Sequence, residues 1–373
     1  MTERETVAVL GGGNGAYAAA ADLALAGHRV RLWRRSREAL APILRSGTIT
    51  LEAEGRAGIA RLERATGDLE EALDGAGIVL IPLPAYAQEE LAARCAPFLR
   101  PDQILWFTPG SLGSYLFART LARKESQLPF ALAESGTLPY LARKVGPAHV
   151  RAPVRAANLP TGVFPAERTA PVLARLAGLF PSVRPCADAL DAALTNAGVV
   201  IHPPLVLLNA GAIEAGCFDI HAAGTTPGIL RVIYAVDAER VRIREALGYP
   251  PPHYAISTYY EEARAEEGLY GARAKAKLVA SGLWDERITL SHRYVTEDVV
   301  QGLVLFVSLA RALGVAARVS EAFLAIFRRL LPGDPVRTGR SVEQLGLGGL
   351  GTEELRHLFG RGWESPLWAK VIQ

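Results

Sequence analysis

Residues 6–16 read TVAVLGGGNGA, and an alanine-rich stretch follows at residues 18–26. Five apolar or β-branched residues bounded by glycines are typical of a buried parallel strand. The alanines predict a helix that packs close against a sheet. Residues 29–33, RVRLW, indicate a second strand. The chain therefore opens with a strand, a helix and another strand.

The glycine turn in this unit fits the dinucleotide-binding fingerprint G-x-G-x-x-G/A. Gly11 permits the tight turn, Gly13 lets the backbone approach a pyrophosphate, and Ala16 lets the helix lie near the strand. The N–H groups at the start of the helix then point toward the phosphates. The motif alone is weak evidence, but its flanking strands and helix supply the required context. We therefore predict a nicotinamide cofactor site at Gly11, Gly13, Asn14, Gly15 and Ala16.

The second strand bears on the choice of cofactor. Such a strand usually ends in an acid that holds the ribose 2′-OH of NAD, whereas here it runs into Arg34, Arg35 and Ser36. Guanidinium and hydroxyl groups suit a 2′-phosphate, so we expect NADP rather than NAD. A solvated basic face is the alternative. Further along, a strand at 77–81 leads to Pro84, in a loop that we expect beneath the nicotinamide.

Length and composition favour two globular domains. The chain has 373 residues, of which 50% are apolar and 21% are charged. Its net charge of +3 is too small to indicate a nucleic acid or an anionic membrane as a partner, and we expect neither. The partners that we expect are therefore small-molecule substrates, and the composition is also compatible with a homodimer.

The cysteines and the apolar stretches predict a cytoplasmic protein. Cys95, Cys186 and Cys217 are far apart, so neither a disulfide framework nor a metal site is indicated. The N-terminal residues lack the pattern of a signal peptide, so we expect no export signal. The longest apolar stretches, 199–208 and 299–309, are interrupted by polar residues or proline and are too short to span a membrane.

Residues 1–185 are predicted to form a doubly wound parallel sheet. Strands at 77–81, 104–107 and 130–134 alternate with helical stretches. Residues 48–62 predict an inserted β-hairpin, and residues 150–163 predict edge strands. The fold class is therefore α/β in this first, dinucleotide-binding domain.

Residues 186–373 are predicted to form an all-α substrate domain, because apolar residues recur there at helical spacing. The predicted helices are 188–201, 204–216, 229–247, 259–267, 297–313 and 320–331.

One candidate catalytic group in this half is His202, in the stretch NAGVVIHPP at 196–204. Pro203 cannot donate an intrahelical hydrogen bond, so we expect the helix to break or kink at His202 and present the imidazole to a cleft. Asn196 and Asn209 lie on the same helical course. A buried core histidine is the alternative.

A second candidate stretch is HRYVTED at 292–298. If Asp298 or Glu297 faces His202, its carboxylate would fix the imidazole tautomer and stabilise the imidazolium. Simple capping of the apolar helix that follows is the alternative. Arg293 is available to bind a substrate carboxylate.

A third stretch, ESGTLPYLAR at 134–143, follows a predicted strand of the first domain. We expect Glu134, Thr137 and Arg143 to face substrate, with Arg143 able to bind a carboxylate through two hydrogen bonds. A capped, exposed helix start is the alternative.

Taken together, these stretches resemble the octopine/nopaline (opine) dehydrogenase family, in which a Rossmann domain is paired with a helical domain. The similarity runs nearly end to end, through GGGNGAYAAAADLALAGH, AESGTLPYLAR, LTNAGVVIHPPLVLLNAG, AVDAERVRIREALG, HRYVTEDVVQGLV and GRSVEQLGL. The resemblance implies reductive condensation of an amino acid with a 2-oxo acid. It also implies that His202 is the catalytic histidine and Asp298 its partner.

The chain departs from the family pattern on the substrate side. Gly198 replaces the second asparagine of Asn-x-Asn-Pro, and Val299 follows Asp298 where the family usually has proline. The lead of the third stretch is ESGT rather than ETQT. Two other functions therefore stay open, a 2-oxo acid or ketone reductase that forms an alcohol and a non-catalytic NADP-binding regulatory protein.

Overall fold

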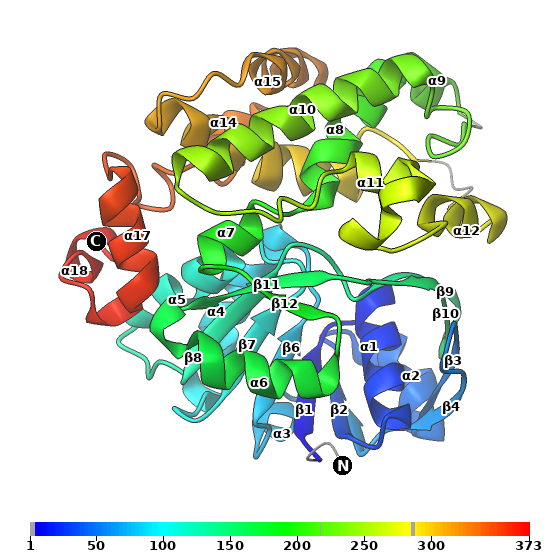
Figure 1. Ribbon diagram of the computed structural model, residues 1–373. Helices are drawn as coiled ribbons and strands as arrows, with labels where there is room; N and C mark the ends of the chain where they lie inside the picture. Colours follow the sequence, from blue (N-terminus) through cyan, green and yellow to red (C-terminus); the bar gives the residue numbers. More distant parts are fainter. Residues whose placement is uncertain (1–3, 217, 285–287) are drawn as a thin grey trace. The chain divides into compact units, whose positions relative to one another are not determined.

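The chain forms two compact units (Figure 1). The computed structural model describes residues 4–216, 218–284 and 288–373, so Cys217 lies outside the described residues. The first unit is Met1–Ala193 with Ile372, and the second is Leu194–Val371 with Gln373.

The division falls later than the predicted one between residues 185 and 186. Helix α7 (Ala189–Ala193) belongs to the first unit because it packs on strand β11 (Leu159–Phe164). A Cβ atom on Gly162 of β11 would lie 1.8 Å from the carbonyl oxygen of Asp188. Glycine at this position therefore allows the chain entering α7 to lie directly on the sheet.

The first unit is built on an eight-stranded sheet with the order β12-β11-β8-β7-β6-β1-β2-β5. Its other strands are β1 (Thr6–Leu10), β2 (Arg29–Trp33), β5 (Arg64–Thr66), β6 (Ile78–Ile81), β7 (Ile104–Phe107), β8 (Ala131–Ser135) and β12 (Val183–Pro185). The strands from β8 to β5 are parallel, as predicted. β11 is antiparallel to β8, and β12 is parallel to β11, so the continuous parallel pairing ends at β8 on this side of the sheet.

A second sheet has the strand order β4-β3-β10-β9. It comprises β3 (Thr48–Ala53), β4 (Gly58–Arg61), β9 (Tyr140–Gly146) and β10 (His149–Arg155). The predicted hairpin at 48–62 is confirmed as the antiparallel pair β3 and β4. Residues 150–163 were expected to form edge strands, but β10 lies inside this second sheet, where it pairs with β3 and β9.

Helix α1 (Asn14–Leu25) contacts strands of both sheets, which explains its run of alanines, since small side chains allow close approach on more than one side. Asp22 of α1 is buried and accepts hydrogen bonds from Arg56, Tyr140 and Arg155. Burial opposes its ionisation, but the hydrogen bonds from Arg155 and Tyr140 outweigh burial and lower the pKa of Asp22. The buried carboxylate thus fixes the second sheet to α1.

The remaining helical segments of the first unit connect the strands. They are α2 (Arg37–Ser46), α3 (Leu69–Leu73), η1 (Ala85–Ala87), α4 (Gln88–Cys95), η2 (Ala96–Phe98), α5 (Gly113–Arg123), η3 (Ala166–Arg168) and α6 (Thr169–Leu179).

The described residues of the second unit contain helices and no strands, as predicted. The segments are α8 (Ala197–Leu208), α9 (Ala210–Ala215), α10 (Pro227–Ala246), α11 (Ser257–Tyr260), η4 (Glu262–Glu267), α12 (Ala274–Ala280), α13 (Arg293–Thr296), η5 (Asp298–Leu303), α14 (Val304–Ala312), α15 (Arg318–Leu330), α16 (Pro335–Thr338), α17 (Thr352–Arg361), η6 (Gly362–Glu364) and α18 (Trp368–Val371).

The predicted helix break at His202 is wrong. Helix α8 continues through Pro203 and Pro204, and both prolines are buried. Each proline removes one backbone donor, and the packing of its ring in the interior offsets that loss. The helical conformation is instead interrupted between α7 and α8, just before Asn196. The side chain of Asn196 caps α8 by accepting a hydrogen bond from the N–H of Gly198.

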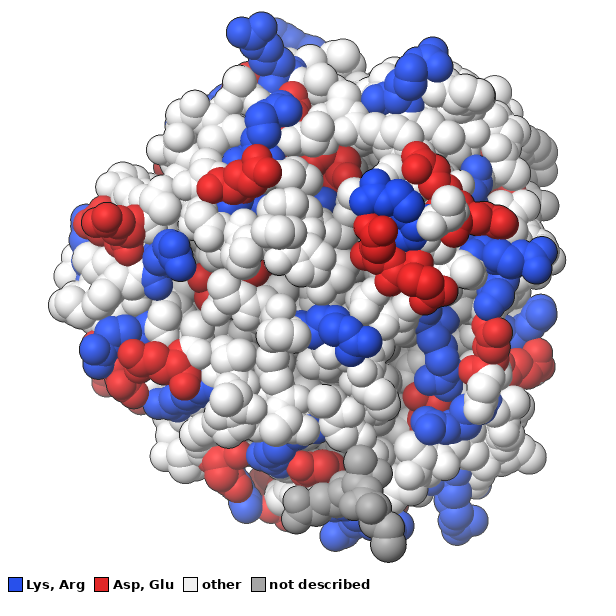
Figure 2. All heavy atoms as spheres, in the orientation of Figure 1, with Lys and Arg blue, Asp and Glu red and all other residues white. Residues whose placement is uncertain are grey.

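Residues 189–208 are apolar and long enough to cross a membrane by length and composition, but 83% of the most apolar window is buried inside the protein. The stretch is therefore accounted for as core. On the visible face in Figure 2, basic and acidic side chains are interspersed, in keeping with the small net charge of +3.

Candidate active site

The glycine turn has the backbone geometry that its motif requires. Gly11 has a φ of +153°, which side chains other than glycine rarely adopt. Its Cβ position would lie 3.3 Å from Ala16 and 3.3 Å from Leu83. Apart from its two chain neighbours, no atom of the described residues lies within 4 Å of the Cβ position of Gly13. The turn is therefore tight at its start and open at Gly13, as approach of a pyrophosphate requires.

The side chains around this turn hold it in place. The Asn14 side chain accepts a hydrogen bond of 2.9 Å from the backbone N–H of Lys144 in β9. A Cβ atom on Gly15 would lie 2.7 Å from Leu138. The predicted residues Asn14 and Gly15 thus join the turn to the second sheet and its neighbouring loop.

Two cations lie over the turn. Arg34 donates to the hydroxyl of Tyr17 at 2.8 Å and to the carbonyl of Ala39 at 2.9 Å, and its side chain covers Gly12. The ammonium of Lys144 donates to the carbonyl of Gly12 at 2.9 Å. Burial and the charge of Arg34 lower the pKa of Lys144. Sequence reasoning missed Lys144, although this residue directly follows Arg143, the last residue of the stretch 134–143.

A pocket of about 470 Å³ opens beside the turn. Its lining includes Gly13, Arg34, Arg35, Ser36 and Leu83. Ser36 caps α2 by accepting from the N–H of Ala39, and Arg35 forms an exposed ion pair with Glu90 at 3.1 Å. Pro84 precedes η1, next to this lining. The turn, the cations and the volume together fit a dinucleotide.

Glu134 and Thr137 are buried within the first unit. The Glu134 carboxylate accepts hydrogen bonds from the N–H groups of Leu112 and Ser114, at 2.8 and 3.0 Å. This placement favours an internal cap for the start of α5 over a substrate contact. Arg143 lies in β9, so the alternative of a helix start at 134–143 is wrong.

In the second unit, two glycines bring η5 against α8. A Cβ atom on Gly302 would lie 2.2 Å from Val199, and one on Gly198 would lie 2.6 Å from Oδ1 of Asp298. The π-helical turn at η5, in which the N–H of Gly302 donates to the carbonyl of Glu297, is a feature often found at functional sites. Gly198, a departure from the family pattern, thus leaves room for the Asp298 carboxylate.

His202 and Asp298 are in contact, as the sequence reading required. Nδ1 of His202 lies 2.6 Å from Oδ2 of Asp298, and both side chains are largely buried. Burial raises the pKa of Asp298 to about 7, and the charge of Arg293 acts in the opposite direction. The hydrogen-bonded pair can therefore gain or lose a proton near neutral pH.

Two aromatic residues that sequence reasoning missed extend this pair. The Tyr294 ring stacks on His202 with the ring centroids 3.7 Å apart. The Tyr294 hydroxyl lies 3.0 Å from Nε2 of His221. Tyr294 was within a quoted motif, but His221 lies in a loop without a recognisable pattern.

The other predicted residues have local contacts. Asn209 donates to the carbonyls of Leu205 and Gly224, at 2.8 and 3.2 Å, and Asn196 caps α8, so both organise the backbone beside His202. The side chain of Arg293 is 45% exposed, and its Nε lies 4.0 Å from Glu297. Its guanidinium therefore remains accessible to an anion.

Comparisons with known proteins identify the family of this chain. Residues 185–331 match the family model described as NAD/NADP octopine/nopaline dehydrogenase, alpha-helical domain. Residues 6–111 match that of the NAD-dependent glycerol-3-phosphate dehydrogenase N-terminus. An opine dehydrogenase from Arthrobacter sp. (strain 1C) is 30% identical over 363 residues, which cover 95% of this chain and 99% of that protein. The chain belongs to the octopine/nopaline (opine) dehydrogenase family.

Other relatives support the assignment. The protein ocs of Agrobacterium vitis is 28% identical over 92% of this chain and 96% of its own length. An octopine dehydrogenase structure in complex with NADH and agmatine has a TM-score of 0.69 at 21% identity, covering 90% of this chain and 94% of that one. A yersinopine dehydrogenase structure with NADP⁺ bound has a TM-score of 0.64 at 14% identity, covering 98% and 99%. These two structures share the fold.

Family membership defines the class of reaction. The protein is an NAD(P)-dependent dehydrogenase that acts on CH–NH bonds, with a Rossmann unit and a helical unit, and its substrates are small molecules.

Proposed function

We propose that the protein uses NADPH to condense an amino acid with a 2-oxo acid, giving an N-(carboxyalkyl) amino acid. The amine attacks the keto carbon, water leaves, and the resulting imine accepts a hydride at carbon. The observation that carries this proposal is the 2.6 Å contact between His202 and Asp298. A protein that only bound the dinucleotide would have no need of such a proton-transfer pair.

The cofactor supplies the hydride when it is bound by the glycine turn and the pocket beside it. The residues that would hold it are Gly11, Gly13, Arg34 and Lys144, since they combine open backbone with two positive charges. Lys144, which the sequence did not predict, would add a positive charge for the pyrophosphate of the bound cofactor.

His202 handles the protons. Asp298 holds Nδ1, so proton exchange with substrate falls to Nε2. A protonated imidazole donates its proton to the leaving oxygen during loss of water. The carbinolamine nitrogen keeps its own hydrogen as water departs, so the imine forms protonated, which makes its carbon a better hydride acceptor. Asp298 stabilises the imidazolium during these steps.

Both substrates carry carboxylates, and arginine binds a carboxylate through two parallel hydrogen bonds. Arg293 is a candidate because it is half exposed and close in sequence to Asp298. Arg143 of β9 is the corresponding candidate in the first unit.

NADP is the proposed cofactor because Arg34 lines the pocket at the end of β2, where an acid would repel a 2′-phosphate. In the present structure its guanidinium donates to Tyr17 and Ala39, so the side chain is already held beside the pocket. Among the relatives above, one structure contains NADH and another NADP⁺, and both cofactors therefore have to be tested.

We expect NADPH to bind more tightly than NADH, since a charged contact of this kind contributes about 1.5 to 3 kcal/mol, or roughly 10- to 100-fold in dissociation constant. Arg34→Asp should abolish or reverse the preference. The control is Arg45→Asp, which makes the same charge change at the exposed end of α2. Fluorescence titration of both cofactors provides the measurement. Equal dissociation constants in the unmodified protein would contradict the assignment of NADP.

The overall proposal is tested by following NADPH oxidation over a matrix of 2-oxo acids and amino acids. Oxidation should require one of each. Oxidation with a 2-oxo acid alone would favour a ketone reductase, and absence of turnover over the whole matrix, with cofactor binding retained, would favour a regulatory protein.

A further inference from the structure

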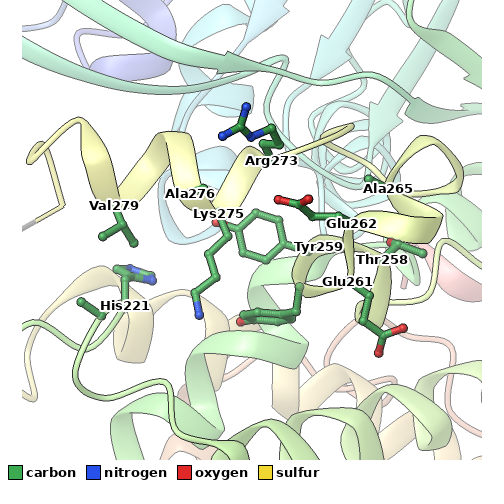
Figure 3. Close-up of a pocket in the computed structure, with 12 residues that line it drawn as sticks. His221, Thr258, Tyr259, Glu261, Glu262, Ala265, Arg273, Lys275, Ala276 and Val279 are labelled. Atoms are coloured by element: carbon green, nitrogen blue, oxygen red, sulfur yellow. The ribbon is translucent and has the colours of Figure 1, made fainter.

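The second unit contains a pocket of about 370 Å³ that the proposed mechanism has not used (Figure 3). Its walls come from the loop that holds His221, from α11 and η4, and from α12. The volume lies in the range of about 300 to 1,000 Å³ that is usual for small-molecule sites. The rings of Tyr259 and Tyr260 and the side chain of Val279 supply apolar surface.

The pocket is coupled to the catalytic pair through aromatic contacts. His221 lines the pocket, and its ring centroid lies 6.2 Å from that of His202. Tyr294 joins the two, since it bonds to His221 through its hydroxyl and stacks on His202. A ligand in this pocket would therefore lie next to the residues that handle protons.

Lys275 gives the pocket its charge specificity. The side chain runs into the pocket between His221 and Tyr259 (Figure 3), and its ammonium lies 5.1 Å from the centroid of the Tyr260 ring. Within the described ranges, no carboxylate pairs with this ammonium. Burial lowers the pKa of Lys275, so an anion placed beside the ammonium would be stabilised more than it would be in water.

The acids of the pocket do not satisfy Lys275. Glu261 interacts with Tyr234 of α10, where burial, helped by the charge of Glu261 and its hydrogen bond, raises the pKa of the tyrosine. Glu262 lies toward Arg273, away from the Lys275 ammonium (Figure 3). Charges of both signs, separated across an aromatic-walled pocket, suit a ligand that is itself a zwitterion.

We propose that this pocket binds the amino-acid substrate and that Lys275 binds its carboxylate. The proposal rests on the proposed function and adds the residue that selects the amine substrate. The carboxylate is either the α-carboxylate or one at the end of an acidic side chain, and the same lysine chemistry serves both. The apolar walls pack against the aliphatic part of the amino acid.

The test uses the full chain with saturating NADPH and three probes, L-alanine, L-glutamate and n-butylamine, measured by calorimetry. Lys275→Met keeps the length of the side chain and removes the charge, and it should weaken carboxylate-bearing ligands about 10- to 100-fold. Lys275→Arg should retain most of the affinity. Lys277→Met, on the same helix but outside the pocket lining, is the matched control and should behave as the unmodified protein does.

The three probes distinguish the two carboxylates. Loss of affinity for both amino acids but not for n-butylamine assigns the α-carboxylate, and loss for L-glutamate alone assigns the side-chain carboxylate. Unchanged affinity for both amino acids in Lys275→Met, or equal loss for all three probes, would overturn the proposal.

Steady-state kinetics separate this proposal from the proposed function. Lys275→Met should raise KM for the amino acid and leave KM for the 2-oxo acid and the affinity for NADPH within about twofold. Turnover with an unchanged amino-acid KM would refute the role of Lys275 and leave the reaction intact. Charge-dependent amino-acid binding without turnover would keep the site and refute the reaction.

Discussion

His202→Ala is expected to lower kcat by about 10²- to 10⁴-fold, the range for loss of a general acid or base. The imidazole is the group in contact with Asp298, and its unperturbed pKa of about 6.5 suits proton exchange at neutral pH. NADPH affinity should not change, because the cofactor residues belong to the first unit. Stopped-flow measurement of NADPH oxidation and a separate titration of cofactor binding give the two quantities.

The control for this variant is His357→Ala. His357 lies in α17, where it contacts Ser365, and its removal takes an imidazole from the same unit. It should leave kcat within about twofold. Full activity of His202→Ala would refute the mechanism, whereas loss of activity accompanied by loss of folded protein in circular dichroism would call for His202→Gln, which retains most of the side-chain volume and should be equally inactive.

Asp298→Asn is expected to lower kcat by about 10²-fold, because the amide cannot stabilise the imidazolium as a carboxylate does. The pH profile gives the sign of the effect. An ionised Asp298 favours the charged imidazole, so its removal lowers the pKa of His202. The transition that the hydrogen-bonded pair produces near pH 7 should therefore move to lower pH in this variant.

The competing explanation is that Asp298 serves only to cap the apolar helix that follows it. In that case Asp298→Asn would lower the melting temperature slightly and leave both kcat and the pH profile unchanged. Asp334→Asn serves as the control, since Asp334 caps α16 by accepting from the N–H of Val336. It should keep the helix cap and normal kinetics and lose only a little stability, because its ion pair with Arg328 is removed.

The local pattern of the sequence was sufficient to predict the glycine turn, the helical second half and five strands of the main sheet, β1, β2, β6, β7 and β8, but not β5 or β12. These features depend on residues that are neighbours in the chain, such as the alanines of α1 or the apolar run of β6. The second sheet was only partly predicted, because β3 pairs with β10 across about a hundred residues. Nothing in the sequence of β10 alone distinguishes that partner from the edge of the main sheet.

The site residues that could be predicted are those whose residue type alone indicates their chemistry. His202 and Asp298 were predicted from the sequence. Their contact, however, requires α8 and η5 to pack closely, and glycine at 198 and 302 is what leaves room for that packing. Lys144 of the cofactor site was missed for a related reason, since β9 brings it to Gly12 from a distant part of the chain.

Two expectations drawn from the local sequence depended on tertiary packing. Glu134 looked like a substrate ligand because it follows a strand, yet it is fully buried and accepts backbone N–H groups of α5. Proline at 203 and 204 looked like a helix break, yet α8 accommodates both rings in its buried surface. Both placements depend on tertiary packing, and that information is not local.

The central claim is that the reduced bond joins carbon to nitrogen, and mass spectrometry of the product tests it most directly. The reaction is run with ¹⁵N-labelled amino acid, a 2-oxo acid and NADPH that carries deuterium at the transferred position. The account predicts a secondary-amine dicarboxylate that contains the ¹⁵N and one deuterium on the former keto carbon. A hydroxy acid that carries the deuterium, with the amino acid recovered unchanged, would contradict it.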